Sequence, residues 1–208
     1  THSIDCVLDI GAHKGEFGNK IRQSGFTGKI ISFEPQKEIY EHLLNIIKKD
    51  KNWFLHSRCA IGERNKVENL NILSETQCSS ILKPNKDFFD FDKNIKKIGV
   101  EKCNVYSLDF IIENHYPISE NMYVKIDTQG YDKKVLDGFR KNINKVKFIQ
   151  LEAGLYKLYE EEELYEYYLN FFKSVDFELW NINPFAYTRS GRLVQFDLTF
   201  RNKRFKYI

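Results

Sequence analysis

Residues 7–15 read Val7-Leu8-Asp9-Ile10-Gly11-Ala12-His13-Lys14-Gly15, an apolar run that ends in an acidic residue and a turn with two glycines. A second apolar run at 29–33 ends in Glu34, 19 positions after Gly15, close to the roughly 20 residues that one strand–helix–strand step needs. Gly11 and Gly15 would let the backbone approach a ligand, and Glu34 could accept hydrogen bonds from two ribose hydroxyls. The pattern predicts a nucleotide-like cofactor at the edge of a parallel sheet.

The number of glycines in this turn indicates which cofactor it holds. A dinucleotide fingerprint carries three glycines so that a pyrophosphate can rest on the helix N-terminus. This turn has two, with His13 where the second glycine of that fingerprint stands. Asp9 also places a negative charge beside the turn, which suits the amino group of S-adenosylmethionine better than the pyrophosphate of NAD. We therefore expect S-adenosylmethionine as cofactor. An NAD-dependent oxidoreductase and a tight turn with no ligand are the alternatives.

Length and composition favour one globular domain. The 208 residues suffice for a single domain, 1–208, and because the sequence begins with Thr1 we expect it to be part of a longer chain. The net charge of +3 is small and the basic residues are dispersed, so we expect no nucleic-acid partner. No apolar run reaches ~18 residues, so we expect no membrane span. The four cysteines show no metal-ligand spacing and are typical of reduced thiols in a cytoplasmic protein.

Apolar runs alternate with segments of helical spacing, which predicts an α/β fold with a mostly parallel sheet and a terminal antiparallel hairpin. Residues 76–94 are polar and aromatic without a clean period, and we expect them to form a loop that closes over the acceptor side. The predicted strands are residues 4–9, 29–33, 53–56, 67–73, 100–106, 122–126, 146–151, 177–181 and 193–201, and the predicted helices are residues 15–24, 36–49, 108–113, 132–139 and 160–174.

Four segments, taken in order, carry a resemblance to a known family. They are the stretch at 7–15, Ser32-Phe33-Glu34-Pro35, Ala60-Ile61-Gly62, and Lys125-Ile126-Asp127-Thr128-Gln129-Gly130-Tyr131-Asp132 followed by Val135-Leu136-Asp137-Gly138. With this set, and an ending Gln195-Phe196-Asp197-Leu198 like the family's last strand, the chain resembles the FkbM family of S-adenosylmethionine-dependent methyltransferases over about residues 4–201. His13 departs from the asparagine that is usual in the family, but its side chain can still donate or accept a hydrogen bond.

The resemblance implies a Rossmann-like class I methyltransferase fold with seven strands, the last one antiparallel, and helices on both faces. It also implies O-methylation of a hydroxyl on a sugar, a glycan or a related small molecule. A domain that binds the cofactor without catalysing is an alternative from another class. The acidic residues described next are all present, which favours an enzyme.

Four acidic residues stand at the predicted ends of parallel strands, where open α/β sheets bind their ligands. We expect Asp9 to hold the amino end of the cofactor, directly or through water, and Glu34 to take the ribose hydroxyls. We expect Asp127 and Glu152, on adjacent strands, to face the acceptor, where one is the general base or the two bind a divalent cation. A helix N-cap is the alternative role for Asp127. The cofactor set is Asp9, Gly11, His13, Gly15, Glu34, Pro35, Ala60, Ile61 and Asp127, with Ala60 and Ile61 near the adenine.

Two further patterns concern the acceptor. Tyr156, Tyr159 and Tyr187 could stack on a sugar ring, although packing in the core is the commoner role of such tyrosines. Asn183-Pro184-Phe185 resembles part of a motif of amino-methylating DNA enzymes, but it lies far downstream of the strand that carries Asp127. Because no basic stripe accompanies it, we do not expect methylation of nucleic acid.

Overall fold

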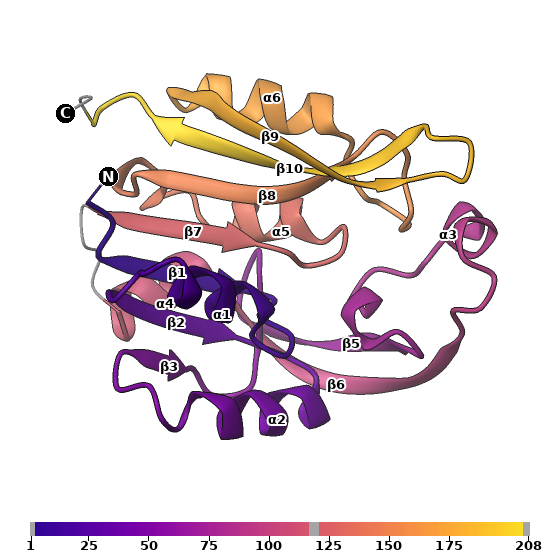
Figure 1. Ribbon diagram of the computed structural model, residues 1–208, viewed down its shortest axis with the longest axis horizontal. Coiled ribbons are helices and arrows are strands. Elements are labelled where there is room, and N and C mark those ends of the chain that lie inside the picture. The colour runs from indigo at the N-terminus through magenta and orange to yellow at the C-terminus, as the bar shows by residue number, and fades with distance from the viewer. Residues whose placement is uncertain (1–2, 117–120, 206–208) are drawn as a thin grey trace.

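Two β-sheets form the frame of the molecule in the computed structural model, which describes residues 3–116 and 121–205. The larger sheet has seven strands in the order β3-β2-β1-β7-β8-β10-β9, and the smaller has three in the order β4-β6-β5 (Figure 1). In the large sheet β10 pairs antiparallel with both of its neighbours, β8 and β9, and all other neighbouring strands are parallel. Its strands are β1 (Cys6–Ile10), β2 (Lys29–Phe33), β3 (Trp53–Leu55), β7 (Met122–Ile126), β8 (Phe148–Gly154), β9 (Phe177–Tyr187) and β10 (Leu193–Asn202).

This strand order confirms the predicted parallel sheet with a terminal antiparallel hairpin. The chain runs outward from β1 to β2 and β3, and it later crosses back to place β7 on the other side of β1. In open α/β sheets the ligand crevice forms at such a switch point, beyond the carboxyl ends of the strands. The topology therefore places a site where β1 and β7 end.

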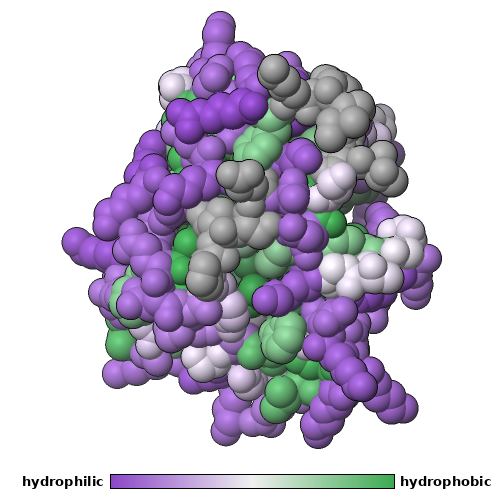
Figure 2. All heavy atoms as spheres, turned by 90° about the vertical axis from the view of Figure 1, so that its left-hand side faces the viewer, coloured by the Kyte–Doolittle hydropathy of each residue, from purple (hydrophilic) through white to green (hydrophobic). Residues whose placement is uncertain are grey.

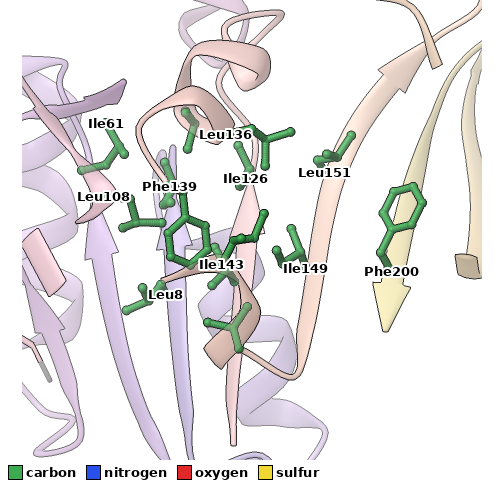
Figure 3. Close-up of a cluster of buried hydrophobic side chains, with 14 of the residues drawn as sticks. Leu8, Ile61, Leu108, Ile126, Leu136, Phe139, Ile143, Ile149, Leu151 and Phe200 are labelled. Atoms are coloured by element: carbon green, nitrogen blue, oxygen red, sulfur yellow. The ribbon is translucent and has the colours of Figure 1, made fainter. Parts of the chain in front are cut away.

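Helices cover both faces of the large sheet because its central strands are apolar on both sides. Val7 of β1 packs with Leu43 of α2 on one face. The next residue, Leu8, packs with Leu108 of α4 on the other face, where side chains from β7, β8 and α5 join the cluster (Figure 3). The helices of the large sheet are α1 (Glu16–Gln23), α2 (Lys37–Ile47), α4 (Leu108–Asn114), α5 (Asp132–Asp137) and α6 (Tyr165–Ser174), and a 3-10 turn, η2 (Ile143–Lys145), precedes β8.

The small sheet lies outside the large one. The strands predicted at 67–73 and 100–106 are confirmed as β5 (Lys66–Leu73) and β6 (Lys97–Ser107), which pair with each other, and β4 (Ala60–Gly62) joins the other edge of β6. The segment between β5 and β6 was predicted to be an irregular loop. It contains two short helical elements instead, η1 (Thr76–Cys78) and α3 (Lys86–Phe91). The Asn85 side chain caps α3 by accepting a hydrogen bond from the backbone N–H of Phe88 (3.0 Å). A helix of six residues is too short to show a clear period in the sequence.

The helix predicted at 160–174 begins later, at Tyr165. The carboxylate of Glu162 accepts hydrogen bonds from the backbone N–H groups of Leu158 and Tyr159 (2.6 and 2.9 Å). These bonds close a turn ahead of the helix and delay its start.

The end of the molecule opposite the expected site is mostly hydrophilic. Figure 2 shows small apolar areas there, separated by polar and charged side chains. In the ranges that the structure describes, no helix is long and apolar enough to cross a membrane. The four cysteines are free thiols, three of them buried, in agreement with the prediction of reduced thiols.

The turn after β1 depends on a glycine at position 11. Gly11 has a φ of +76°, and a Cβ atom added there would lie 1.8 Å from the carbonyl oxygen of Asp127. The N–H of Asp127 in turn donates to the carbonyl of Ile10 (2.9 Å). Gly11 thus lets the ends of β1 and β7 close against each other, which is a constraint of the fold in addition to any approach of a ligand.

We expect Gly11→Ala to destabilise the protein far more than Gly25→Ala. Both glycines have positive φ, +76° and +93°, but nothing lies within 4 Å of the Cβ position at Gly25. The left-handed backbone alone should cost Gly25→Ala about 1–2 kcal/mol, whereas Gly11→Ala must also move a strand end and should cost more than about 3 kcal/mol. Urea unfolding measures both free energies. Equal losses would contradict the importance of the close approach.

Candidate functional site

A cleft of about 900 Å³ opens at the carboxyl ends of the parallel strands. Its floor is formed by the ends of β1, β2, β7 and β8, and its walls by α1, residues 77–81 and the β9–β10 hairpin. Small-molecule sites commonly occupy about 300–1,000 Å³. The cleft therefore has the size and the place expected for a cofactor and an acceptor together.

Glu34, directly after β2, is held firmly at one edge of the cleft. Its Oε2 accepts a hydrogen bond from the backbone N–H of His13 (2.8 Å), and its Oε1 accepts one from the N–H of Gln36 (2.8 Å). Glu34 is 3% exposed, and burial, opposed by these two bonds, raises the pKa of its carboxyl to about 7. Each oxygen keeps a second lone pair, so the carboxylate can still accept two ligand hydroxyls.

The ring of His13 ties the turn after β1 to the wall of the cleft. Nδ1 lies 3.1 Å from Oε1 of Glu16, and Nε2 lies 2.9 Å from Oγ1 of Thr76. The carbonyl of Thr76 also accepts a hydrogen bond from the side chain of Gln36 (2.9 Å). His13 lines the cleft, as its predicted contact with a ligand requires, but both ring nitrogens already have partners in the protein.

One part of the cleft is apolar. Ala60 and Ile61 of β4, Leu70 of β5 and Ile81 line it together. Apolar side chains suit a flat aromatic ring that must leave water. This is the chemistry expected of Ala60 and Ile61 in the sequence.

The sequence predicted that Asp9 ends a strand, and this is wrong. Asp9 lies inside β1 and is fully buried. The strand register places Ser32 of β2 and Lys125 of β7 on either side of it. The carboxylate accepts a hydrogen bond from Ser32 Oγ (3.4 Å) and lies 3.7 Å from Lys125 Nζ. Burial raises the pKa of Asp9, although Lys125 opposes the shift. Asp9 is not among the residues that line the cleft, so any effect on a ligand passes through a neighbour.

Lys125 connects Asp9 to the floor of the cleft. Its Nζ donates to Asp127 Oδ2 (2.9 Å) and lies 5.6 Å from the ring centre of Phe17 on α1. Burial lowers the pKa of Lys125, but the carboxylates of Asp127 and Asp9 raise it by more, so the side chain stays an ammonium. In the same way burial raises the pKa of Asp127, while Lys125 and Gln129 bring it below its usual value.

Asp127 directly follows β7, whereas Glu152 lies inside β8 and not at its end as the sequence predicted, because the strand continues to Gly154. The side chain of Gln129 joins the two carboxyls. Its Nε2 donates to Asp127 Oδ1 (2.9 Å) and to Glu152 Oε2 (3.3 Å), and the Gln195 amide donates to Glu152 Oε1. Burial and the nearby charge of Asp127 raise the pKa of Glu152 well above its usual value. The two carboxyls therefore differ in their pKa: Asp127 stays ionised, and Glu152 binds a proton more readily.

Two alternatives for this pair can be compared with the geometry. The N-cap of α5 is Tyr131, so Asp127 is not the N-cap residue that one alternative required. For a divalent cation, no group of three or more His, Cys, Asp or Glu side chains within residues 3–116 and 121–205 is arranged to hold a metal ion.

Polar residues of the hairpin extend the cleft beyond Glu152. Asp197 of β10 lies opposite Glu152 in the strand register and accepts a hydrogen bond from Asn183 of β9 (3.3 Å). Burial raises the pKa of Asp197. Gln150 and Thr199 are opposite each other two residues further along the same strands. Carboxylates and amides in this arrangement are groups that bind hydroxyls.

The structure separates the predicted residues into those that line the cleft and those that do not. Asp9 and Gly15 do not line it, and Gly15 instead leaves room for Leu43 of α2, whose Cδ1 would lie 2.8 Å from an added Cβ. Tyr156, Tyr159 and Tyr187 are also absent from the lining. The predicted cofactor and catalytic residues that line the cleft are Gly11, His13, Glu34, Pro35, Ala60, Ile61, Asp127 and Glu152.

Sequence patterns alone assigned no role to Lys125, Gln129 or Gln195. Lys125 did carry a signal, because a charged residue inside a buried strand needs a partner. It stands two positions before Asp127 and so shares its face of the sheet. The contacts of Gln129 and Gln195 depend on which strands are neighbours, which no local pattern shows.

We expect Lys125→Met to destabilise the protein by about 3–5 kcal/mol near neutral pH, because Asp9 and Asp127 are left without a cation. In the wild type the lowered pKa of Asp127 contributes stability above the ordinary carboxyl range, and this is lost as pH falls through the folded pKa. In the variant both carboxyls gain protons on folding. The deficit should therefore shrink as the pH falls from about 7 to about 5. Urea unfolding at several pH values measures it, with Lys14→Met at an exposed lysine as control. A deficit that does not vary with pH would sink this account.

Comparisons with known proteins also indicate a methyltransferase. The sequence matches the methyltransferase FkbM domain over residues 9–179. TrmK of M. capricolum, solved with S-adenosylhomocysteine, superposes with a TM-score of 0.55 at 8% identity, covering 97% of this chain and 63% of that one. A SAM-dependent methyltransferase of Leishmania major superposes with a TM-score of 0.52 at 11% identity, covering 96% of this chain and 65% of that one. Sp1610 of Streptococcus pneumoniae, a putative tRNA (m1A22) methyltransferase, gives 0.50 at 8%, covering 99% and 67%.

These solved structures show a shared fold, since their sequences are far from this one. The chain spans less than two thirds of the length of the first two of them. A search of curated proteins found no match. The match to residues 9–179 covers most of the chain and shows its family. The chain belongs to the FkbM methyltransferase family.

Proposed function

We propose that this FkbM-family domain transfers a methyl group from S-adenosylmethionine to a hydroxyl of a sugar, a glycan or a related small molecule. The observation that carries the proposal is Glu34, whose two oxygens are held by backbone N–H groups and which lines the cleft at the carboxyl ends of the parallel strands. A carboxylate fixed there can accept two adjacent ribose hydroxyls, and the apolar lining beside it can take a flat base. The residues present therefore fit this cofactor.

The acceptor half of the cleft supports a hydroxyl-rich acceptor. Glu152, Asp197, Gln150 and Asn183 line it, and these side chains offer acceptors and donors suited to hydroxyl groups. A phosphodiester would bring negative charge close to Glu152 and Asp197, while the neighbouring ammonium of Lys125 is already engaged by Asp127. We therefore propose a small-molecule or glycan acceptor and not a nucleic acid.

The side chains of the cleft divide the work of the reaction. The cofactor supplies a methyl group on a sulfonium, ready for in-line displacement by the acceptor oxygen. In its ionised form Glu152 accepts the proton of the acceptor hydroxyl, because the surroundings that raise its pKa make this form a stronger base than an ordinary carboxylate. Asp127 stays ionised beside Lys125, and Gln129 orients both carboxylates. Asp197 and Asn183 hold further hydroxyls of the acceptor.

We expect the affinity for S-adenosylhomocysteine to depend on pH through Glu34. The pKa of Glu34 is about 7, and ribose hydroxyls favour its ionised form. Wild-type affinity should fall by up to about tenfold for each pH unit below about 7. Glu34→Gln should bind more weakly by about 1.5–3 kcal/mol above that pH and lose the dependence. Calorimetry measures the affinities, with Glu38→Gln at an exposed position of α2 as control. Unchanged binding in Glu34→Gln would place the cofactor elsewhere.

We expect Glu152→Gln to lower turnover by about 10²–10⁴-fold, the usual effect of removing a general base. Its affinity for S-adenosylhomocysteine should change little, because Glu152 lies on β8, away from Glu34 and the turn after β1. Release of S-adenosylhomocysteine with a panel of sugars measures turnover, and Glu160→Gln at an exposed site is the control. Wild-type turnover in Glu152→Gln, with and without added Mg²⁺, would exclude Glu152 from the chemical step.

A further inference from the structure

The side chain of Gln129 is itself held from behind by a buried tyrosine. The hydroxyl of Tyr159 lies 3.0 Å from Gln129 Oε1 and 2.7 Å from the carbonyl oxygen of Cys78. Tyr159 is 1% exposed and does not line the cleft, and its ring packs against Phe88 of α3 with the ring centres 5.3 Å apart. The core therefore fixes where this hydroxyl lies.

The neighbours of the Gln129 amide decide which way it points, because its nitrogen and oxygen have nearly the same shape. Asp127 Oδ1 lies 2.9 Å from Nε2 and is ionised beside Lys125. An amide turned round would set its oxygen against this carboxylate. Tyr159 completes the constraint, because its hydroxyl can donate to Oε1. In this orientation the two N–H groups of the amide point at Asp127 and Glu152.

The hydroxyl of Tyr159 has one proton and two acceptors. Burial, together with nearby groups that include Cys78 and Glu152, raises the pKa of Tyr159 well above its usual value, so the hydroxyl keeps its proton. When this proton is directed to Gln129, the carbonyl of Cys78 loses it, and the reverse also holds. The tyrosine is thus shared between the amide that contacts Glu152 and the η1 wall of the cleft.

We propose that Tyr159 is a positioning residue, whose hydroxyl locks the Gln129 amide with its N–H groups toward Asp127 and Glu152 and so keeps Glu152 ready to accept a proton. The inference rests on the proposed role of Glu152 as the base and extends it to a residue outside the cleft. A hydrogen bond donated to a carboxylate favours the ionised form. Loss of the lock should therefore make Glu152 harder to ionise.

The surroundings of Glu152 make this effect measurable. Four carboxylates from four different parts of the chain favour its protonated form, whereas the ammonium of Lys125 and the amides of Gln129 and Gln195 favour its ionised form. With so many like charges nearby, a single donated hydrogen bond matters. The four carboxylates are those of Asp127 at the end of β7, Asp132 of α5, Asp197 of β10 and Glu162 before α6.

The test compares the titration of Glu152 in the wild type and in Tyr159→Phe, which keeps the ring and removes the hydroxyl. We expect the midpoint to rise by about 0.5–1 pH unit, which is roughly 3–10-fold tighter proton binding. Gln129→Leu removes the donor itself and should raise the midpoint further. Tyr156→Phe, at a tyrosine with no hydrogen bond to Gln129, is the matched control and should leave the midpoint unchanged. Carbon-13 NMR of protein labelled at the glutamate carboxyls follows the signal that Glu152→Gln removes.

A shift in Gln129→Leu without one in Tyr159→Phe would overturn the inference, and so would an equal shift in Tyr156→Phe. If Tyr159→Phe does not fold, the side-chain N–H signals of Gln129 in the wild type decide instead. They should exchange slowly with solvent, and fast exchange would overturn the lock. These measurements need neither cofactor nor acceptor. Failure of the proposed function would show separately, as no binding of S-adenosylhomocysteine by the wild type.

Discussion

The ammonium of Lys125 is the contact on which the rest of the site depends. It lies between Asp9, fully buried in β1, and Asp127 at the end of β7, and so it neutralises carboxylates on the two strands that meet at the switch point. Because Asp127 is then held ionised, it fixes the Gln129 amide, and the amide in turn reaches Glu152 on β8. The position of the proposed base is thus set by a charge pair that begins two strands away.

A short segment of the cleft wall is linked to both halves of the site. Thr76 of η1 is bound by His13 and Gln36, next to the carboxylate of Glu34. Two residues later the carbonyl of Cys78 is within reach of Tyr159, which also reaches Gln129. The sequence predicted a closing loop in this region. The structure gives its first part fixed contacts with the proposed cofactor side and the proposed acceptor side, and closure on binding stays a prediction.

Local patterns predict the parts of this molecule that depend on neighbouring residues. The turn from Gly11 to Gly15 and Glu34 at the end of the next strand are visible as spacing, so the parallel sheet and one edge of the cleft follow from the sequence. The polar contacts of the floor do not. Asp9 contacts Lys125 only because β1 and β7 are neighbours in the sheet, although more than a hundred residues separate them in the sequence. The sequence also ended the first strand one residue too early, so that Asp9 was placed at its end and not inside it.

The same reason explains what was absent from the predicted site. Tyr159 and Gln129 are 30 positions apart in the sequence, and no pattern around either residue predicts their contact. Strands β5 and β6 were predicted, but their pairing was not, because more than twenty residues with η1 and α3 separate them. The order of the motifs along the sequence carried the family resemblance, but the hydrogen bonds that join those motifs come from the strand register.

Calorimetric titration of the wild-type protein with S-adenosylhomocysteine, and separately with NADH, tests the central claim most directly. The two-glycine turn and the held carboxylate of Glu34 predict that S-adenosylhomocysteine binds at one site per chain and that NADH does not bind. Binding of NADH with no binding of S-adenosylhomocysteine would contradict the account.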